Sequence, residues 1–464
     1  MKTQTRRQFL IKATRSAAVA GAVAQVPSLL AQVAGERPQR AAGVEVLNPR
    51  NRVPVGVIID DSTCLVNLNR FAMPQFNEAF GGQNKSYHRN WRDWPVEIPD
   101  EFVRRFGEWA TAEGVKGKWS VVPYPACVGR LDRALPGWTQ SELKNSLDLV
   151  RSVMMPNWDI HPEMVTHTRV IDTRTGHPFA DHSLKFMENW DWTAGKSVDE
   201  LADYLAYALR ILKNAGLPCD GVTTPGGFGK GALPQLAQAT LQSVRSVFGT
   251  EVPHYFRDLH DHGTESVAPR VQYAAGLDGS DPRCVVSILA CTGDWTGGWD
   301  CEPPGGADKF ITEDLQRGRM VEVIQRGEPA FMLAHWTGVF WNGQELGFKI
   351  FQETVRRLKA RFDNLIWMKL SEAARYWAAR ELTQIDRAGE SFEFLAPYAC
   401  PEFTMRFGMR GNQVPHRVAG GMAMPLDEVG SPKTLVPGSW CREGQKAIAC
   451  FGLTKGKSRL ELRG

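Results

Sequence analysis

Between residues 53 and 380, short apolar runs alternate with longer segments in which apolar residues recur every three to four positions. A short apolar run is typical of a buried strand, and the longer period is typical of a helix that buries one face. The predicted strands are residues 55–59, 118–122, 158–161, 221–224, 284–290, 330–334 and 365–368. The predicted helices are residues 102–113, 139–154, 198–215, 233–244, 311–325, 345–361 and 371–380.

This alternation of strand and helix predicts an α/β fold with parallel strands joined by helical crossovers. Because the unit recurs about seven times, we expect a distorted (β/α)7-type barrel over residues 53–385 rather than an open sheet. In such barrels the reacting groups follow the carboxyl ends of the strands. The polar residues directly after each apolar run are therefore the candidates for chemistry.

The pattern changes after residue 385, where short strand-like runs are separated by Gly and Pro. We expect a small all-β, sandwich-like module over residues 386–464. Its predicted strands are residues 391–395, 404–407, 414–418, 447–451 and 459–462. Residues 35–52 carry no such pattern, and we expect them to be a linker.

The first 34 residues resemble a twin-arginine export signal, with Arg6-Arg7 before a weakly apolar, Ala-rich stretch. Arg15 and Pro27 interrupt this stretch, which is therefore too short to cross about 30 Å of hydrocarbon. We expect a cleaved signal peptide over residues 1–34, recognition of the precursor by the twin-arginine export machinery, and a periplasmic or secreted mature protein. No other run is long enough to predict a membrane span.

The composition excludes several classes of protein. With 464 residues, 43% hydrophobic and 23% charged, the chain has the make-up of a globular enzyme and not of a disordered or fibrous protein. A net charge of +4 gives no argument for nucleic acid. The nine cysteines lack CxxC spacing, so a zinc ribbon is not indicated. Cys291 with Cys301, or Cys441 with Cys450, could form a disulfide, but buried free thiols are the better expectation.

Two carboxylates, Asp60 and Asp61, directly follow the apolar run 55–59. Adjacent residues point in different directions, so one could bind a metal ion while the other accepts a proton. The alternative is that the pair caps the following turn.

A second group lies after the strand at residues 158–161. If Pro162 starts a helical turn, Glu163 and His167 stand four apart on one face and can reach a single divalent ion. The same spacing is frequent on ordinary helix surfaces. His161 is an alternative metal ligand, since it lies two residues before Glu163.

Two further strands end in chemistry-bearing residues. His335 closes the run 330–334 and can act as a general acid, because the pKa of an imidazole is normally about 6.5. Asp294 and Trp295 follow the run 284–290, and Trp336 follows His335. Aromatic faces stack well on sugar rings, although core packing is the more common role of a tryptophan.

In order and placement, these residues resemble the polysaccharide deacetylase family, the relatives of the nodulation-factor chitooligosaccharide deacetylase, over residues 53–380. Asp60-Asp61 match the two acids that end the family's first motif, and Asp294-Trp295 match the fourth. The sequence Leu-Ala-His ending at His335 matches the fifth.

Two motifs depart from the family pattern. Residues 159–167 follow the register of the second motif, but Glu163 replaces its first histidine and Met164 replaces its hydroxyl residue. Residues 223–226 read Thr-Thr-Pro-Gly, so the arginine of the third motif, which would hold the catalytic base, is missing.

The resemblance implies an exported, metal-dependent hydrolase that removes acyl groups from a glycan. It implies Asp60 as the base and His335 as the acid. The implied metal ligands are Asp61, Glu163 and His167, and the substrate would be bound by Asp294, Trp295 and Trp336. This ligand set suits zinc best and would also accept manganese, cobalt or iron.

Two alternatives remain open at this point. The first is a glycoside hydrolase that needs no ion and pairs Asp61 or Asp294 with Glu163 as its two carboxyl groups. The second is a catalytically inactive barrel whose loop tryptophans bind glycan. Metal content separates the first alternative from the deacetylase, and loss of sugar binding without loss of turnover would identify the second.

Overall fold

The computed structural model describes residues 35–419 and 421–464, so the predicted signal peptide lies outside the described residues. Within these ranges, no helix combines the length and the apolar character needed to cross a membrane.

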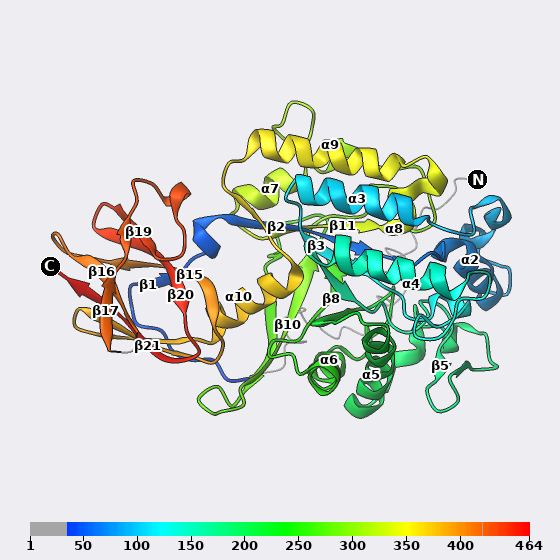
Figure 1. Ribbon diagram of the computed structural model, residues 1–464, viewed down its shortest axis with the longest axis horizontal. Helices are drawn as coiled ribbons and strands as arrows, with labels where there is room; N and C mark the ends of the chain where they lie inside the picture. Colours follow the sequence, from blue (N-terminus) through cyan, green and yellow to red (C-terminus); the bar gives the residue numbers. More distant parts are fainter. Residues whose placement is uncertain (1–34, 420) are drawn as a thin grey trace, which may run out of the picture. The chain divides into compact units, whose positions relative to one another are not determined.

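Strands in the first part of the described chain form two mainly parallel sheets (Figure 1). The first sheet has the order β11 (Ala330–His335), β2 (Val53–Asp60), β3 (Gly117–Ser120) and β4 (Trp158–His161), and β12 (Leu365–Trp367) also pairs with β2. The second has the order β7 (Gly221–Thr223), β8 (His254–Leu259), β10 (Arg283–Ala290) and β9 (Arg270–Ala275), with β9 antiparallel. Every residue of β2 is buried, as its continuous apolar run predicts.

The α-helices of this part are α2 (Leu68–Ala79), α3 (Asp100–Ala112), α4 (Gln140–Leu149), α5 (Val198–Asn214), α6 (Leu233–Phe248), α7 (Arg319–Gln325), α8 (Trp336–Phe340), α9 (Leu346–Arg361) and α10 (Leu370–Leu382). Most of the helices lie where the sequence pattern predicts them, whereas α2 and α8 were not predicted and α7 is shorter than the helix predicted over residues 311–325. Capping boxes start α4 at Thr139 and α5 at Ser197. Figure 1 shows α3 and α9 side by side, and aromatic contacts such as Phe106 with Phe351 join them.

The mixed α/β fold is confirmed, but the hydrogen bonds do not close the strands into one barrel. The two sheets meet at an isolated bridge between Glu163 and Thr223. On the other side, the backbone N–H of Cys291 donates to the carbonyl of Phe331 at 2.8 Å. A small hairpin of β5 (Ile171–Asp172) and β6 (His177–Pro178) lies in the loop after β4.

Two five-stranded sheets form the predicted all-β module. One has the order β1 (Val44–Val46), β15 (Cys400–Gly408), β20 (Lys446–Leu453), β19 (Ser439–Glu443) and β18 (Asp427–Glu428). The other has the order β13 (Gln384–Ala388), β14 (Ser391–Ala396), β21 (Gly456–Arg463), β16 (Val414–Ala419) and β17 (Met422–Pro425). Phe392 and Phe407 meet across the two sheets with ring centroids 4.9 Å apart, so the sheets share one core.

The predicted linker over residues 35–52 is only partly a connection. Its residues 44–46 form β1, which pairs antiparallel with β15 and places Val44 opposite Phe407. Val46 is buried in the core of the module. Three residues are too few for a periodicity to be visible in the sequence, so the strand could not be predicted. The first sheet of the module therefore takes an edge strand from the other end of the chain.

Helix α10 links the module to the α/β part. Tyr376 on this helix donates to the carbonyl of Leu47 at 2.7 Å, and its neighbour Trp377 is buried. Residues of α10, β10 and the module belong to one continuous apolar cluster. The α/β part and the module are thus joined by packing as well as by the chain.

Candidate active site

The two adjacent acids lie at the carboxyl end of β2, as predicted. Asp60 is the last residue of the strand, and Asp61 follows with a φ of +61°. This change of backbone direction sends the two carboxylates to different partners. Asp60 contacts Lys118, whereas Asp61 Oδ1 lies 2.7 Å from Nε2 of His167.

Glu163 and His167 come together, although not through the predicted helical turn. The loop after Pro162 is irregular, with φ values of +52° at Met164 and +63° at His167. His167 Nε2 lies 3.4 Å from Oε1 of Glu163, and the backbone N–H of Asp61 donates to Glu163 Oε2 at 2.8 Å. The helical turn considered at Pro162 does not form, but Glu163 and His167 still face each other.

Asp61, Glu163 and His167 are buried, and one ligand atom of each lies within 4.8 Å of the others. Two tetrahedral ligands at zinc distances are about 3.3–3.5 Å apart. The separation between His167 and Glu163 already matches this value, whereas that between His167 and Asp61 is a hydrogen-bond distance. Two carboxylate oxygens and one imidazole nitrogen form a donor set that fits a divalent metal.

Charge balance in this group supports the same interpretation. Burial opposes a charged imidazole, but Asp61 and Glu163 hold the pKa of His167 well above its usual value. Burial raises the pKa of Glu163, and the facing His167 more than offsets it, so the pKa is lowered. Protonation of His167 balances part of the charge of the two carboxylates, and a metal ion bound by the three residues would do the same.

Asp60 has a partner that the sequence did not predict. Lys118, on the neighbouring strand β3, is fully buried and donates from Nζ to Asp60, to the carbonyl of Ile59 at 3.1 Å and to Ser120 Oγ at 2.6 Å. Burial and the charge of Glu163 raise the pKa of Asp60 to about 7, although Lys118 and His335 lower it. Asp60 therefore has a buried cationic partner on the neighbouring strand.

His335 and Asp294 form a second acid–base pair. His335 Nδ1 lies 2.7 Å from Asp294 Oδ2, and Asp294 Oδ1 accepts from the N–H and the hydroxyl of Thr296. Burial opposes protonation of His335, but Asp61 and Asp294 raise its pKa to about 9. The ring is therefore protonated near neutral pH. Because Asp294 binds Nδ1, Nε2 is the nitrogen that can reach a substrate.

The two predicted aromatic substrate contacts have different surroundings. Trp295 is half-buried and meets the ring of Phe310 edge-on, with centroids 4.9 Å apart. Trp336 is fully buried against Phe102, Phe106 and Trp119. Its assignment as a substrate-binding residue is wrong, because core side chains enclose the indole.

Another set of aromatic side chains lies beside His167, one of the candidate metal ligands. The ring of Phe76 is 6.5 Å from that of His167 and also contacts Tyr87, Trp190 and Trp299. These residues come from α2 and from loops far apart in the sequence. Their convergence depends on the tertiary fold, which a local sequence pattern does not show.

His161 is not a ligand of this group. It is the last residue of β4, and its Nε2 lies 2.9 Å from Nε2 of His254. Glu163, two residues further on, has already left the strand and pairs with Thr223. The strand ends between the two residues, so His161 does not face the ligand group that contains Glu163.

Glu188 orders the loop that carries His167, and the sequence offered no signal for it. Its carboxylate accepts from the backbone N–H groups of Thr166 and of His167, the latter at 2.6 Å, and from the hydroxyl of Tyr204. Burial raises the pKa of Glu188 to about 7. These bonds hold His167 in its left-handed backbone conformation.

Comparison with known proteins gives no family. No family model matches the chain, and no curated protein matches it. Among solved structures, Puue allantoinase is 10% identical with a TM-score of 0.37, over 78% of this chain and 98% of the other. The Thermotoga maritima alpha-fucosidase is 10% identical with a TM-score of 0.26, over 90% and 97%. An alpha-L-fucosidase is 10% identical with a TM-score of 0.27, over 90% and 98%. At these values the likenesses carry no functional argument.

Proposed function

We propose that the chain is a metal-dependent hydrolase that cleaves an amide or ester bond, and specifically that it removes acyl groups from a glycan. One observation carries the proposal. Asp61, Glu163 and His167 bring their ligand atoms within 4.8 Å of one another, directly beside Asp60 and in the electrostatic range of His335.

A divalent ion held by Asp61, Glu163 and His167, zinc first and manganese, cobalt or iron as alternatives, would supply Lewis-acid chemistry for water and for the carbonyl group. Asp60 accepts the proton of the attacking water, and its pKa of about 7 suits a general base.

His335, protonated near neutral pH, donates its proton from Nε2 to the leaving nitrogen or oxygen. Lys118 keeps Asp60 in place, and Asp294 fixes the ring of His335. The base and the acid are thus each held by one oppositely charged partner.

The glycan part of the proposal rests on the motifs shared with polysaccharide deacetylases and on the aromatic set around Phe76. Trp190 in this set is half-buried and meets Phe80 edge-on, with ring centroids 5.1 Å apart. Partly exposed indole and phenol rings are suited to stacking on sugar rings. Export through the twin-arginine machinery to the periplasm, proposed from residues 1–34, would place such a protein beside cell-wall or extracellular glycans.

The proposal is tested by metal analysis and acetate release. Protein purified without chelators is expected to contain metal and to release acetate from acetylated chitooligosaccharides, and chelation followed by zinc addition should abolish and restore release. Asp60→Asn should keep the metal and lose release, whereas His167→Gln should lose both. His262→Gln is the matched control, because the side chain of His262 is 88% exposed.

Other outcomes identify the alternatives. Release of reducing sugar ends, unaffected by chelation, would establish a glycoside hydrolase. For the pair Asp61 and Glu163 the geometry disfavours this alternative, because one oxygen of each lies within 4.8 Å of the other and both contact the same imidazole, which leaves little room for a sugar between them. Sugar binding without any turnover in the metal-loaded protein would contradict the proposal and identify a binding protein.

A further inference from the structure

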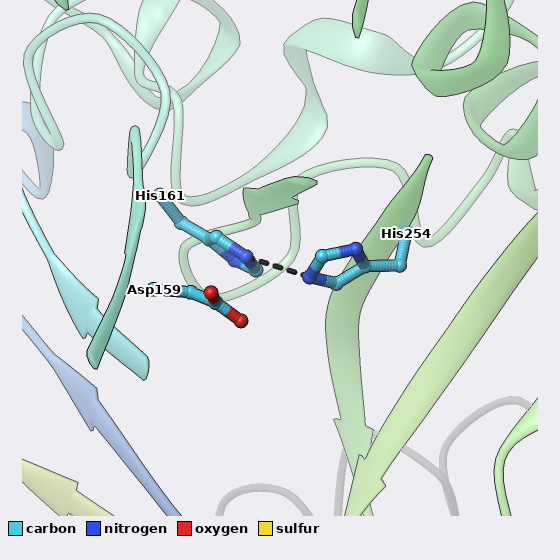
Figure 2. Close-up of side chains that lie close together, drawn as sticks. All are labelled: Asp159, His161 and His254. Carbon is cyan, nitrogen blue, oxygen red and sulfur yellow. Dashed lines mark hydrogen bonds between the residues drawn. The ribbon is translucent and has the colours of Figure 1, made fainter. Parts of the chain in front are cut away.

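A second group of metal-ligating side chains lies away from the candidate active site. Asp159 and His161 come from β4 and His254 from the start of β8, and one ligand atom of each lies within 4.8 Å of the others. Figure 2 shows the two imidazole rings pointing toward each other, with the carboxylate beside them. Both histidines are fully buried.

The two rings approach through their Nε2 atoms, which lie 2.9 Å apart. An ion at the usual zinc–nitrogen distance from both would set these atoms about 3.3 Å apart, so a shift of about 0.4 Å admits one. Gly221 packs closely against both rings, and a side chain at this position would collide with them. A Cβ at Gly221 would lie 2.8 Å from His161 Nε2 and 2.8 Å from Cδ2 of His254.

Contacts on the outer side orient two of the three ligands. His161 Nδ1 lies 3.3 Å from the hydroxyl of Thr223. The carboxylate of Asp159 accepts from the N–H of Ser371 at 2.6 Å and from its hydroxyl at 2.8 Å. Each carboxylate oxygen has two lone pairs, so these bonds leave Asp159 able to bind a cation. Such outer contacts are the usual support of metal ligands.

The donor atoms at this place suit a divalent cation. Two imidazole nitrogens and one carboxylate oxygen form a set that zinc accepts. The carboxylate of Asp159 would offset part of the charge of the ion.

We propose that Asp159, His161 and His254 form a second, structural divalent-metal site, for which zinc is the best-suited ion. The site joins the two sheets of the α/β part, because β4 belongs to the first and β8 to the second. Within residues 35–419 and 421–464, the two sheets otherwise pair on this side at one isolated bridge, between Glu163 and Thr223. The ion would therefore hold β4 and β8 together where no continuous ladder does.

The test uses the full chain, zinc and crystals of the zinc-loaded protein. We expect two zinc ions per chain in the unmodified protein and in His262→Gln, and one in His254→Gln. Anomalous diffraction at the zinc edge should show a peak between Nε2 of His161 and Nε2 of His254. An unchanged zinc count in His254→Gln, with no peak there, would overturn the proposal.

The same data separate this proposal from the proposed function. A single peak at Asp61, Glu163 and His167 would remove the second site and leave the hydrolase intact, whereas a single peak at His161 and His254 would do the reverse. If His254→Gln does not fold, the anomalous map of the unmodified protein decides, because it needs no variant.

Discussion

Replacing Lys118 by methionine is the sharpest test of how this protein holds its proposed base. The substitution keeps an unbranched side chain of similar length and removes the cation that contacts Asp60. Lys118 is fully buried, so water cannot take over its role. The bonds from Nζ to Ser120 and to the carbonyl of Ile59 are lost as well.

The expected change in the pKa of Asp60 follows from the attraction between the buried charges of Lys118 and Asp60. Two unit charges about 4 Å apart at an effective dielectric constant of about 20 attract by about 4 kcal/mol, which corresponds to about 3 pK units. Starting from a pKa of about 7, Asp60 in the variant should therefore stay protonated well into alkaline pH. The ionised fraction of Asp60 at pH 7 should fall by about 100- to 1000-fold.

Two measurements check this. In the metal-loaded protein, the acid limb of kcat/KM against pH should move upward by about 2–3 pH units in Lys118→Met, and Lys118→Arg should restore most of it. In the metal-free protein, the unfolding free energy of Lys118→Met relative to the unmodified protein should fall by about 1.4 kcal/mol per pH unit above pH 7. The sign follows because the native variant keeps a proton on Asp60 that the unfolded chain has released.

A bound metal ion lowers the pKa of Asp60 in the unmodified protein and in Lys118→Met alike. The test therefore compares the position of the acid limb in the two proteins. An acid limb that does not move, in a folded and metal-loaded Lys118→Met, would refute the role of Lys118 beside the base. Loss of metal from the variant would instead show that Lys118 supports the ligands.

Four other predictions follow from the same contacts. Glu188→Gln places an amide against the N–H of His167, so metal affinity should fall by about 10- to 100-fold in chelator competition, whereas Tyr204→Phe should change it less. Trp336→Ala should lower the unfolding free energy by about 3–5 kcal/mol in urea titrations, and a change confined to KM would place Trp336 in the substrate site after all. The pKa of His254 is about 4 in the folded protein and about 6.5 in the unfolded chain. In the metal-free protein, the contribution of His254 to the unfolding free energy should therefore be fully present above pH 6.5 and be lost as the pH falls toward 4. In His254→Gln, the slope of unfolding free energy against pH should be smaller by up to about 1.4 kcal/mol per pH unit. Deleting residues 35–52 removes β1 and exposes the edge of β15, so the midpoint of thermal unfolding measured by circular dichroism should fall. An unchanged midpoint would show that the segment is only a linker.

The elements that could be predicted are those with a strong local pattern. The apolar run of β2 and the capped helices α4 and α5 lie where periodicity places them. Strand β8 was missed because its second half, Arg257-Asp258-Leu259, is polar or exposed. The helix predicted over residues 311–325 starts only at Arg319. Gly318 before it has a non-helical φ of +114°, and a Cβ at this position would lie 2.5 Å from the carbonyl oxygen of Phe310. Closure of the strands depends on pairings that no single segment encodes.

For the candidate site, the strand-end rule was enough to find Asp60, Asp61 and His335. Glu163 and His167 were paired on the assumption of a helical turn that does not form; an irregular loop with positive φ values at Met164 and His167 joins them instead. The partners that were missed come from other elements. Lys118 lies inside a strand, Glu188 in a loop and His254 in a strand that the pattern did not show. Which polar residues face one another is decided by tertiary packing, which a linear pattern does not contain.

The pairing of β1 with β15 also bears on how the chain folds during synthesis. Val44 leaves the ribosome about 360 residues before its partner Phe407. The two strands are thus separated by most of the sequence, and forming the pair costs the entropy of closing a loop of nearly the whole chain. The sandwich can complete its sheet only after translation is almost finished. Until then the β1 segment has no partner strand, which makes nascent or prematurely terminated chains the species most exposed to aggregation.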